Sequence, residues 1–303
     1  MRRKAGNAVV GIEIRTDGIA LAKVTKQSDE SVLQYHNFRP CNAAERAETL
    51  SQLVAEAQCN NARCHLVLPT SNYQTFQVEK PAVEEAEMAE AVRWKLNDLI
   101  DYPIDDAVSD VFEFPSDAGR SRGKMINVVS ARKVVLTDQI KLIQDAGLEL
   151  HCIDITELAL RNICNFFVVD EQTLGFMYLR PGFGIIIFVK GDHLYLSRKI
   201  DVNEAALNSP DTQEAALGQL SLEIQRSMDF FESQLGQIPP KRLLLIGPDV
   251  SLPLAQMLDP LLGVAVDDAN WDEVLEEQDA ENLSRLVMTL PAVGAAYREL
   301  RGE

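Results

Sequence analysis

The chain has 303 residues, a length typical of about two domains. Hydrophobic residues make up 46% of it and charged residues 25%, which is ordinary for a globular protein and excludes collagen-like, low-complexity and largely disordered chains. The 46 Asp and Glu residues outnumber the 29 Lys and Arg residues, so the formal net charge is −17. Phosphate backbones and anionic lipid repel such a chain, and we expect neither nucleic acid binding nor direct insertion into a membrane.

The sequence favours a cytoplasmic location. No apolar run reaches the ~20 residues needed to cross a bilayer, and Glu13 interrupts the apolar run after the basic N-terminus. The five cysteines are scattered and the four histidines are isolated, without the spacing of metal ligands. We therefore expect free thiols, structural histidines and no bound metal.

The first part of the chain alternates between strand and helix patterns. Three short apolar or alternating runs predict an antiparallel meander at residues 8–14, 18–25 and 31–38. A helix capped by Asn42 and a buried strand ended by Pro69 follow, at 43–57 and 65–69. A compact α+β unit comes next, with a helix at 84–100, strands at 108–114 and 125–131, a helix at 134–146 and a strand at 148–153.

The second half repeats the pattern of the first. Three further strands are predicted at 174–180, 184–190 and 193–200, with a turn ending in glycine that resembles the turn of the first meander. This indicates an internal duplication. Four elements then complete the chain: a helix at 213–235, a strand at 242–247, a helix at 252–262, and a last helix at 285–300 that Pro291 interrupts or starts. The acidic run between the last two helices, at 267–281, is expected to be a solvated loop or short helix.

Three segments carry a resemblance to a known family: Glu90–Trp94 leading to Tyr102–Asp105, Val129–Lys133 followed by Asp145–Leu148, and Asp154–Leu160. Together with the order of elements, they resemble PilM-type pilus-assembly proteins, and most closely members that serve mannose-sensitive hemagglutinin (MSHA) pili. The resemblance implies duplicated actin-like, ribonuclease H-like lobes with an inserted α+β subdomain and a reduced or missing helical subdomain in the second lobe. It implies these boundaries: first lobe 1–75, insert 76–153, return to the first lobe 154–172, second lobe 173–284 and a C-terminal helix closing the first lobe at 285–303.

The turns that hold phosphate in actin-like ATPases are degenerate in this sequence. The first turn reads Glu13-Ile14-Arg15-Thr16, so an arginine replaces the glycine of the family pattern. The second reads Tyr178-Leu179-Arg180, which lacks both the acid and the glycine, and Gly247 is followed by Pro248. We therefore expect no catalytic residues, no nucleotide cofactor and no ATP hydrolysis.

The two arginines leave two interpretations open. Arg15 and Arg180 could bind an anion at the position where the two turns of actin-like ATPases hold phosphate, because guanidinium groups suit phosphate and carboxylate. The simpler interpretation, which we favour, is that each pairs with a neighbouring acid such as Glu13 or Asp17.

The family resemblance also implies a partner. In relatives, the cytoplasmic N-terminal peptide of a bitopic, PilN-like inner-membrane protein docks in a groove between the first lobe and the insert. Candidate lining residues are Val92, Leu96, Ile100 and Tyr102, although these positions also fit the core of the insert. The resulting hypothesis is a non-enzymatic component of a type IV pilus platform, in contact with other platform components. The alternatives are an ATP-driven switch of the same fold and, less favoured, a sugar kinase.

Overall fold

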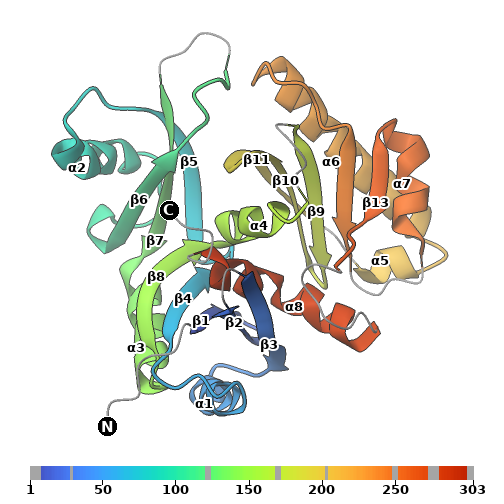
Figure 1. The fold of residues 1–303 in the computed structure, drawn as a ribbon. Helices are drawn as coiled ribbons and strands as arrows, with labels where there is room; N and C mark the ends of the chain where they lie inside the picture. Colours follow the sequence, from blue (N-terminus) through green and yellow to red (C-terminus); the bar gives the residue numbers. More distant parts are fainter. Residues whose placement is uncertain are drawn as a thin grey trace. The chain divides into compact units, whose positions relative to one another are not determined.

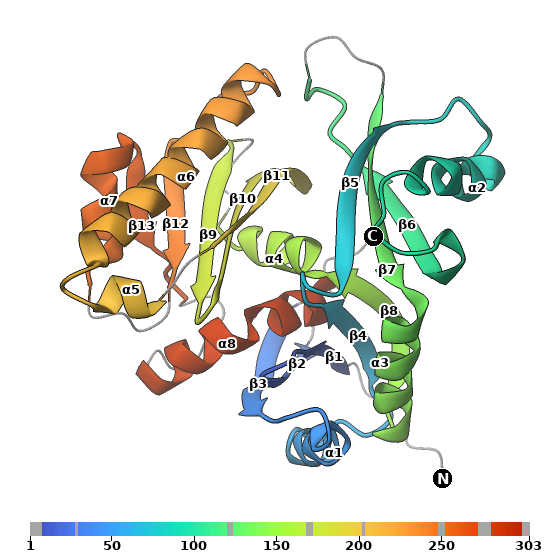
Figure 2. The same ribbon diagram turned by 180° about the vertical axis from the view of Figure 1, so that it is seen from behind.

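The computed structural model describes residues 8–27, 30–119, 124–167, 172–201, 204–247, 252–271 and 280–298. Contacts along the chain divide it into two compact units. Unit 1 comprises Met1–Asp117, Ser121–Ala159 and Pro291–Glu303, and unit 2 comprises Ala118–Arg120 and Leu160–Leu290. The helices and strands are drawn in Figures 1 and 2.

A five-stranded sheet forms the centre of unit 1. Its order is β3-β2-β1-β4-β8, with β1 (Ala8–Ile14), β2 (Gly18–Gln27) and β3 (Glu30–Pro40) antiparallel, and β4 (Arg63–Leu68) and β8 (Glu149–Ile155) parallel to β1. The meander predicted from the alternating pattern is therefore confirmed.

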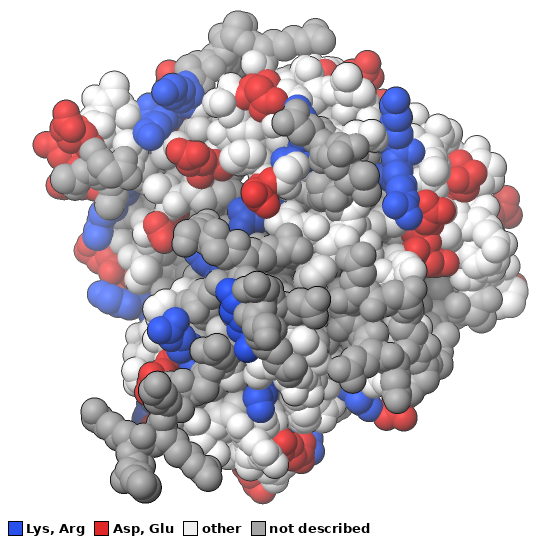
Figure 3. Space-filling view, viewed as in Figure 1, with Lys and Arg blue, Asp and Glu red and all other residues white. Residues whose placement is uncertain are grey.

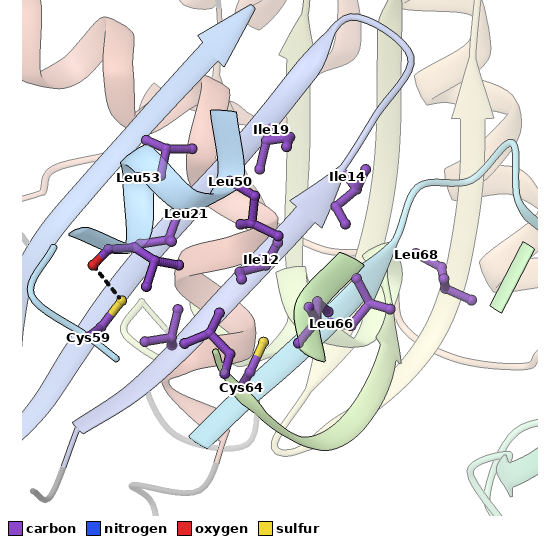
Figure 4. Packing of buried hydrophobic residues seen from close by; sticks show 14 of the residues in the cluster. Ile12, Ile14, Ile19, Leu21, Leu50, Leu53, Cys59, Cys64, Leu66 and Leu68 are labelled. Carbon is purple, nitrogen blue, oxygen red and sulfur yellow. Dashed lines mark hydrogen bonds between the residues drawn. The ribbon is translucent and has the colours of Figure 1, made fainter. Parts of the chain in front are cut away.

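The two faces of this sheet bury different partners because successive side chains on a strand point to opposite sides. On one side, Ile12 and Leu66 pack with helices α1 (Arg46–Glu56) and α3 (Lys133–Asp145) in an apolar core (Figure 4). On the other side, Gly11 faces helix α8 (Ala280–Ala296), and a Cβ atom at this position would lie 1.8 Å from the carbonyl oxygen of Ala292. A glycine is therefore required where α8 meets β1.

The inserted part of unit 1 is a three-stranded antiparallel sheet with one helix. The strand order is β5-β7-β6, comprising β5 (Tyr73–Glu79), β7 (Met125–Arg132) and β6 (Ala107–Glu113). Helix α2 (Glu85–Leu96) packs on this sheet, and a 3₁₀ turn, η1 (Ile104–Asp106), leads into β6. This sheet has an open edge at β6.

Unit 2 contains a sheet with the same order and directions as the first. Strands β9 (Leu174–Arg180), β10 (Phe183–Lys190) and β11 (His193–Ile200) form an antiparallel meander, and β12 (Arg242–Ile246) and β13 (Ala265–Asp268) lie parallel to β9. Helices α4 (Thr156–Cys164), α5 (Glu204–Asn208), α6 (Gln213–Ser233) and α7 (Leu254–Leu262) complete the described elements. The repeat inferred from the sequence thus corresponds to a repeated sheet topology.

The structure corrects several expectations about the elements. Strands β5 and β13 and helix α4 were not expected as separate elements, and α2 ends at Leu96, four residues before its predicted end. Helix α8 begins at Ala280 and runs through Pro291, which neither starts nor interrupts it. The acidic run at 267–281, predicted as a solvated loop or short helix, lies largely outside the described residues, since 272–279 are not described.

Candidate functional site

The first candidate phosphate turn, between β1 and β2, is filled by the side chain of Arg15. Its Nε atom lies 2.8 Å from Oδ1 of Asp17, and its Nη1 atom lies 3.2 Å from Oε2 of Glu13. The guanidinium also stacks on the ring of Phe38, at 4.1 Å from the centroid. Arg15 and Glu13 are both buried.

The backbone of the same turn is also engaged. The Arg15 amide donates to the carbonyl of Gly18 at 2.9 Å, and the Arg15 carbonyl accepts a hydrogen bond from Nη2 of Arg46 at 2.8 Å. Thr16 is exposed at the tip. The ion pairs that we favoured for Arg15 are therefore present, and the same contacts would have to break before a phosphate oxygen could take their place.

The second candidate turn, between β9 and β10, carries an aromatic side chain in place of a carboxylate. Tyr178 is fully buried, and its hydroxyl donates to the carbonyl oxygen of Val287 at 2.5 Å. Arg180 is also buried and lies over the ring of Phe183, at 4.8 Å from the centroid. The Tyr178 hydroxyl is thus bonded to the backbone, and the guanidinium of Arg180 contacts an aromatic ring.

The bond from Tyr178 compensates for a proline in helix α8. In a regular helix, the carbonyl of Val287 would accept from the amide of residue 291, but Pro291 has no N–H. The hydroxyl of Tyr178 supplies the missing donor. This explains how the helix continues through Pro291, and it gives Tyr178 a structural role where ATPases carry an acid.

The third candidate position lies only partly in the described structure. Gly247 follows β12 and is half-buried, whereas Pro248 lies outside the described residues.

Three of the four residues predicted to line a docking groove belong to the apolar cluster of the insert. Val92 and Leu96 are buried with Met88 in the core of the insert, and Ile100 packs against the same cluster. Val92 and Leu96 are therefore unavailable to a docking peptide, and the apolar stripe of α2 is explained by the three-stranded sheet beneath it.

Tyr102 is half-buried and held in place by two contacts. Its hydroxyl donates to Oγ of the buried Ser130 at 2.9 Å, and the guanidinium of Arg132 lies 4.9 Å from its ring centroid. These contacts fix the chain between α2 and β6 against β7. The structure thus gives Tyr102 a role within the insert, and its contribution to partner binding stays a prediction.

A groove of about 520 Å³ does exist in unit 1, between the insert and the five-stranded sheet. Two open strand edges line it, because β6 is the edge of the three-stranded sheet and β8 is the edge of the five-stranded sheet. The lining includes residues 108–112 of β6 and 152–155 of β8, together with Leu68, Val129, Ala131, Leu136, Leu158 and Arg298. The floor and walls are thus mainly apolar.

One part of the groove is polar. Asp154 is buried, its Oδ1 accepts from the backbone amide of Ile155 at 2.9 Å, and its Oδ2 lies 3.1 Å from Nη1 of Arg298. The same guanidinium atom lies 3.9 Å from the sulfur of Cys152, which is half-buried. Sequence reasoning missed this cluster because Arg298 is 144 residues from Asp154 along the chain.

A buried pair braces the start of the insert against α4. The hydroxyl of Tyr73, at the first residue of β5, donates to Oε2 of Glu157 in the first turn of α4. Burial raises the pKa of Glu157, although the Tyr73 hydrogen bond opposes this effect. The hydroxyl of Thr156 donates to the carbonyl of Leu68 at 3.0 Å and closes the same junction.

His65 joins two strands of the five-stranded sheet of unit 1 to the C-terminal helix. His65 is buried, stacks with His151 and has Nδ1 2.7 Å from the carbonyl oxygen of Ala295. Among the described residues, no group of His, Cys, Asp and Glu has the arrangement of a metal site, and no helix has the length and apolar character to cross a membrane.

Comparison with solved structures defines the class of fold. A match to a protein from Bacteroides thetaiotaomicron, described as having an actin-like ATPase fold, has a TM-score of 0.53 and 11% identity, and covers 94% of this chain and 97% of that one. The chain therefore has the actin-like ATPase fold, with two lobes of the same sheet topology.

Two solved structures from assembly systems also match. A PilM–PilN type IV pilus biogenesis complex gives a TM-score of 0.78 at 21% identity, covering 96% of this chain and 98% of that chain. The cytoplasmic domain of EpsL, an inner-membrane component of the type II secretion system of Vibrio cholerae, gives 0.57 at 14% identity, covering 95% and 94%. No family model and no curated protein sequence matches the chain. At these identities, the likeness establishes the fold.

Proposed function

We propose that the chain is a non-enzymatic assembly component of a type IV pilus inner-membrane platform, of the MSHA kind and similar to MshI. Its recruiting partner would be the cytoplasmic N-terminal peptide of a bitopic, PilN-like membrane protein. The observation that carries this proposal is the groove in unit 1 bounded by two open strand edges. The likeness to the PilM–PilN complex supports the choice of partner.

An extended peptide suits this groove for two physical reasons. Strands β6 and β8 are edge strands of the described sheets, so each has a side to which an extended peptide could add as a further strand. The apolar lining, for example Phe112, Leu136 and Ile153, would bury alternate side chains of the peptide. Backbone pairing would supply affinity, and the pockets between these side chains would supply selectivity.

The state of the two phosphate turns supports a function without catalysis. The guanidinium of Arg15 is held by Glu13 and Asp17, and Tyr178 donates to a backbone carbonyl. Replacing a phosphate-site acid and a glycine with these side chains removes the groups that would coordinate magnesium and approach the phosphates. On this proposal, the protein reaches the inner membrane through its partner and contacts other platform components there.

A matched pair of variants tests the docking site. Val108 lies on β6 in the groove and is 42% exposed, whereas Leu261 lies on α7, far from it in sequence and in a different unit, and is 50% exposed. Val108→Asp should weaken binding of the synthetic partner peptide at least tenfold, which corresponds to ~1.4 kcal/mol. Leu261→Asp should leave the affinity unchanged. Equal affinities for both variants would contradict docking in this groove.

Thiol labelling gives an independent measurement. Cys152 lines the groove, whereas the other four cysteines are buried. Burial raises the pKa of Cys59 to about 11 and also raises the pKa values of Cys64 and Cys164, which keeps these thiols unreactive. The partner peptide should therefore slow the labelling of Cys152 by an aromatic disulfide reagent. Labelling at the same rate with and without saturating peptide would contradict the proposal.

A further inference from the structure

A second groove, of about 580 Å³, lies in unit 2 at the end of the sheet where β12 begins. Two cationic side chains, Lys190 and Lys241, contribute to its lining, and the described residues that line it include no carboxylate. Ile238 also lines it and is 77% exposed, which leaves a large aliphatic side chain facing solvent. The volume is within the range of ordinary ligand sites.

The charge and the apolar side chain of this groove indicate which kind of surface would bind there. The chain carries a net charge of −17, and Asp and Glu side chains are spread over the face drawn in Figure 3. A groove lined by Lys241 and an exposed isoleucine is complementary to an apolar side chain that has a carboxylate beside it.

Helix α2 of unit 1 presents such a surface. Its buried side holds Met88, Val92 and Leu96, so positions 87, 90 and 94 lie on the opposite side of the helix. Trp94 is 74% exposed on that side, and Glu87 and Glu90 are exposed beside it. We call Glu87, Glu90 and Trp94 the outer face of α2.

The basic residues of α2 do not neutralise the outer face. Nη2 of Arg93 lies 2.7 Å from the carboxylate of Asp105, and Nζ of Lys95 donates to the carbonyl of Glu79 at 2.8 Å. Both groups are therefore directed toward other parts of the insert. The outer face thus combines a large apolar side chain with local negative charge.

We propose that the outer face of α2 in one copy of this chain docks into the unit 2 groove of a second copy. The indole of Trp94 would pack against Ile238, and Glu90 would face Lys241. Because the two surfaces differ, the contact is head-to-tail, and each copy keeps one face and one groove for a further copy. This inference concerns self-association and does not depend on the peptide groove of unit 1.

The net charge sets the strength of this contact. Copies that each carry −17 repel one another at long range, so the association is weak in dilute solution and rises steeply with protein concentration. Tethering copies to one membrane platform would raise their effective concentration and favour the contact.

Sedimentation velocity across a concentration series, on the full chain, tests the proposal. The weight-average mass should rise with concentration for the wild type, and Trp94→Ala should shift this rise to at least tenfold higher concentration. Leu261→Ala, which removes a different exposed apolar side chain, should match the wild type. A wild type that stays monomeric throughout, or a Trp94→Ala variant that associates like it, overturns the proposal.

Charge reversal provides a sharper version of the same test. Glu90→Lys and Lys241→Glu should each lose association alone, because like charges then meet at the contact. An equimolar mixture should recover it, since the altered face of one variant suits the altered groove of the other. Circular dichroism checks that both variants are folded. A mixture that associates no better than its components contradicts the proposed contact.

Discussion

The bond between Tyr178 and the carbonyl of Val287 gives a quantitative test of the role of Tyr178. Tyr178→Phe keeps the ring and its packing but removes the hydroxyl that donates to that oxygen, which Pro291 leaves without a helical partner. Leaving a buried carbonyl unsatisfied costs ~1–3 kcal/mol. We therefore expect Tyr178→Phe to lower the free energy of unfolding of unit 2 by ~2 kcal/mol.

Pro291→Ala supplies the matched background. An alanine at this position restores the amide that bonds to the carbonyl of Val287, so the loss of the Tyr178 hydroxyl should then be less damaging. Tyr178→Phe should cost ~1 kcal/mol less in the Pro291→Ala protein than in the wild type, as a double-mutant cycle measures.

Urea denaturation followed by the fluorescence of Trp271 reports on unit 2. Trp271 is buried there against Phe167, with ring centroids 5.2 Å apart, so its emission shifts when unit 2 unfolds. Trp94→Phe removes the signal from the exposed tryptophan of unit 1. If Tyr178→Phe costs the same with proline or alanine at position 291, the hydroxyl does not compensate for the proline, and our explanation of Tyr178 is wrong.

Two further predictions concern the stability of the protein: one tests the close contact at Gly11, and the other tests the pH dependence that Glu157 causes. Gly11→Ala should destabilise the protein by more than ~3 kcal/mol in thermal denaturation, because the added methyl would meet the carbonyl of Ala292 at 1.8 Å and backbone must move. Gly218→Ala, in α6 with open space around it, should instead stabilise by ~0.5–1 kcal/mol; a loss at both positions would mean that helix α8 is not the cause. Since burial raises the pKa of Glu157 in the folded state, the unfolded chain binds fewer protons there, and stability should fall as the pH rises from the unfolded pKa through the folded one. Glu157→Gln still accepts from the Tyr73 hydroxyl and should flatten that fall, and an unchanged pH profile of unfolding would rule out this carboxyl as its source.

Local patterns predicted most of the fold. The meander strands are apolar or alternating and separated by short turns, so β1, β2, β9, β10 and β11 were expected within a few residues of their observed bounds. Strand β5 was missed because its sequence is largely polar, and β13 because it has four residues. Helix α8 was misjudged at Pro291, because the donor that compensates for this proline is 109 residues away in sequence from the carbonyl it serves.

For the candidate sites too, contacts between residues close in the sequence could be predicted, whereas those between distant residues could not. The ion pairs of Arg15 were predictable because Glu13 and Asp17 are two residues away in a tight turn. The apolar stripe of α2 could not distinguish a docking surface from a core, and burial decides for the core at Val92 and Leu96. The position of the groove in unit 1 depends on which strands are at the edges of the two sheets. Pairing between strands that are distant in the sequence determines these edges, so no local pattern could predict where the groove lies.

The most direct test of the proposed function is a calorimetric titration of the full chain with the synthetic N-terminal peptide of its PilN-like partner, with and without ATP and magnesium. We predict the same dissociation constant within about twofold under both conditions, and ATP binding no tighter than ~1 mM, or about −4 kcal/mol. A micromolar affinity for ATP, or peptide binding that requires ATP, would contradict a non-enzymatic adaptor and favour a nucleotide-driven switch.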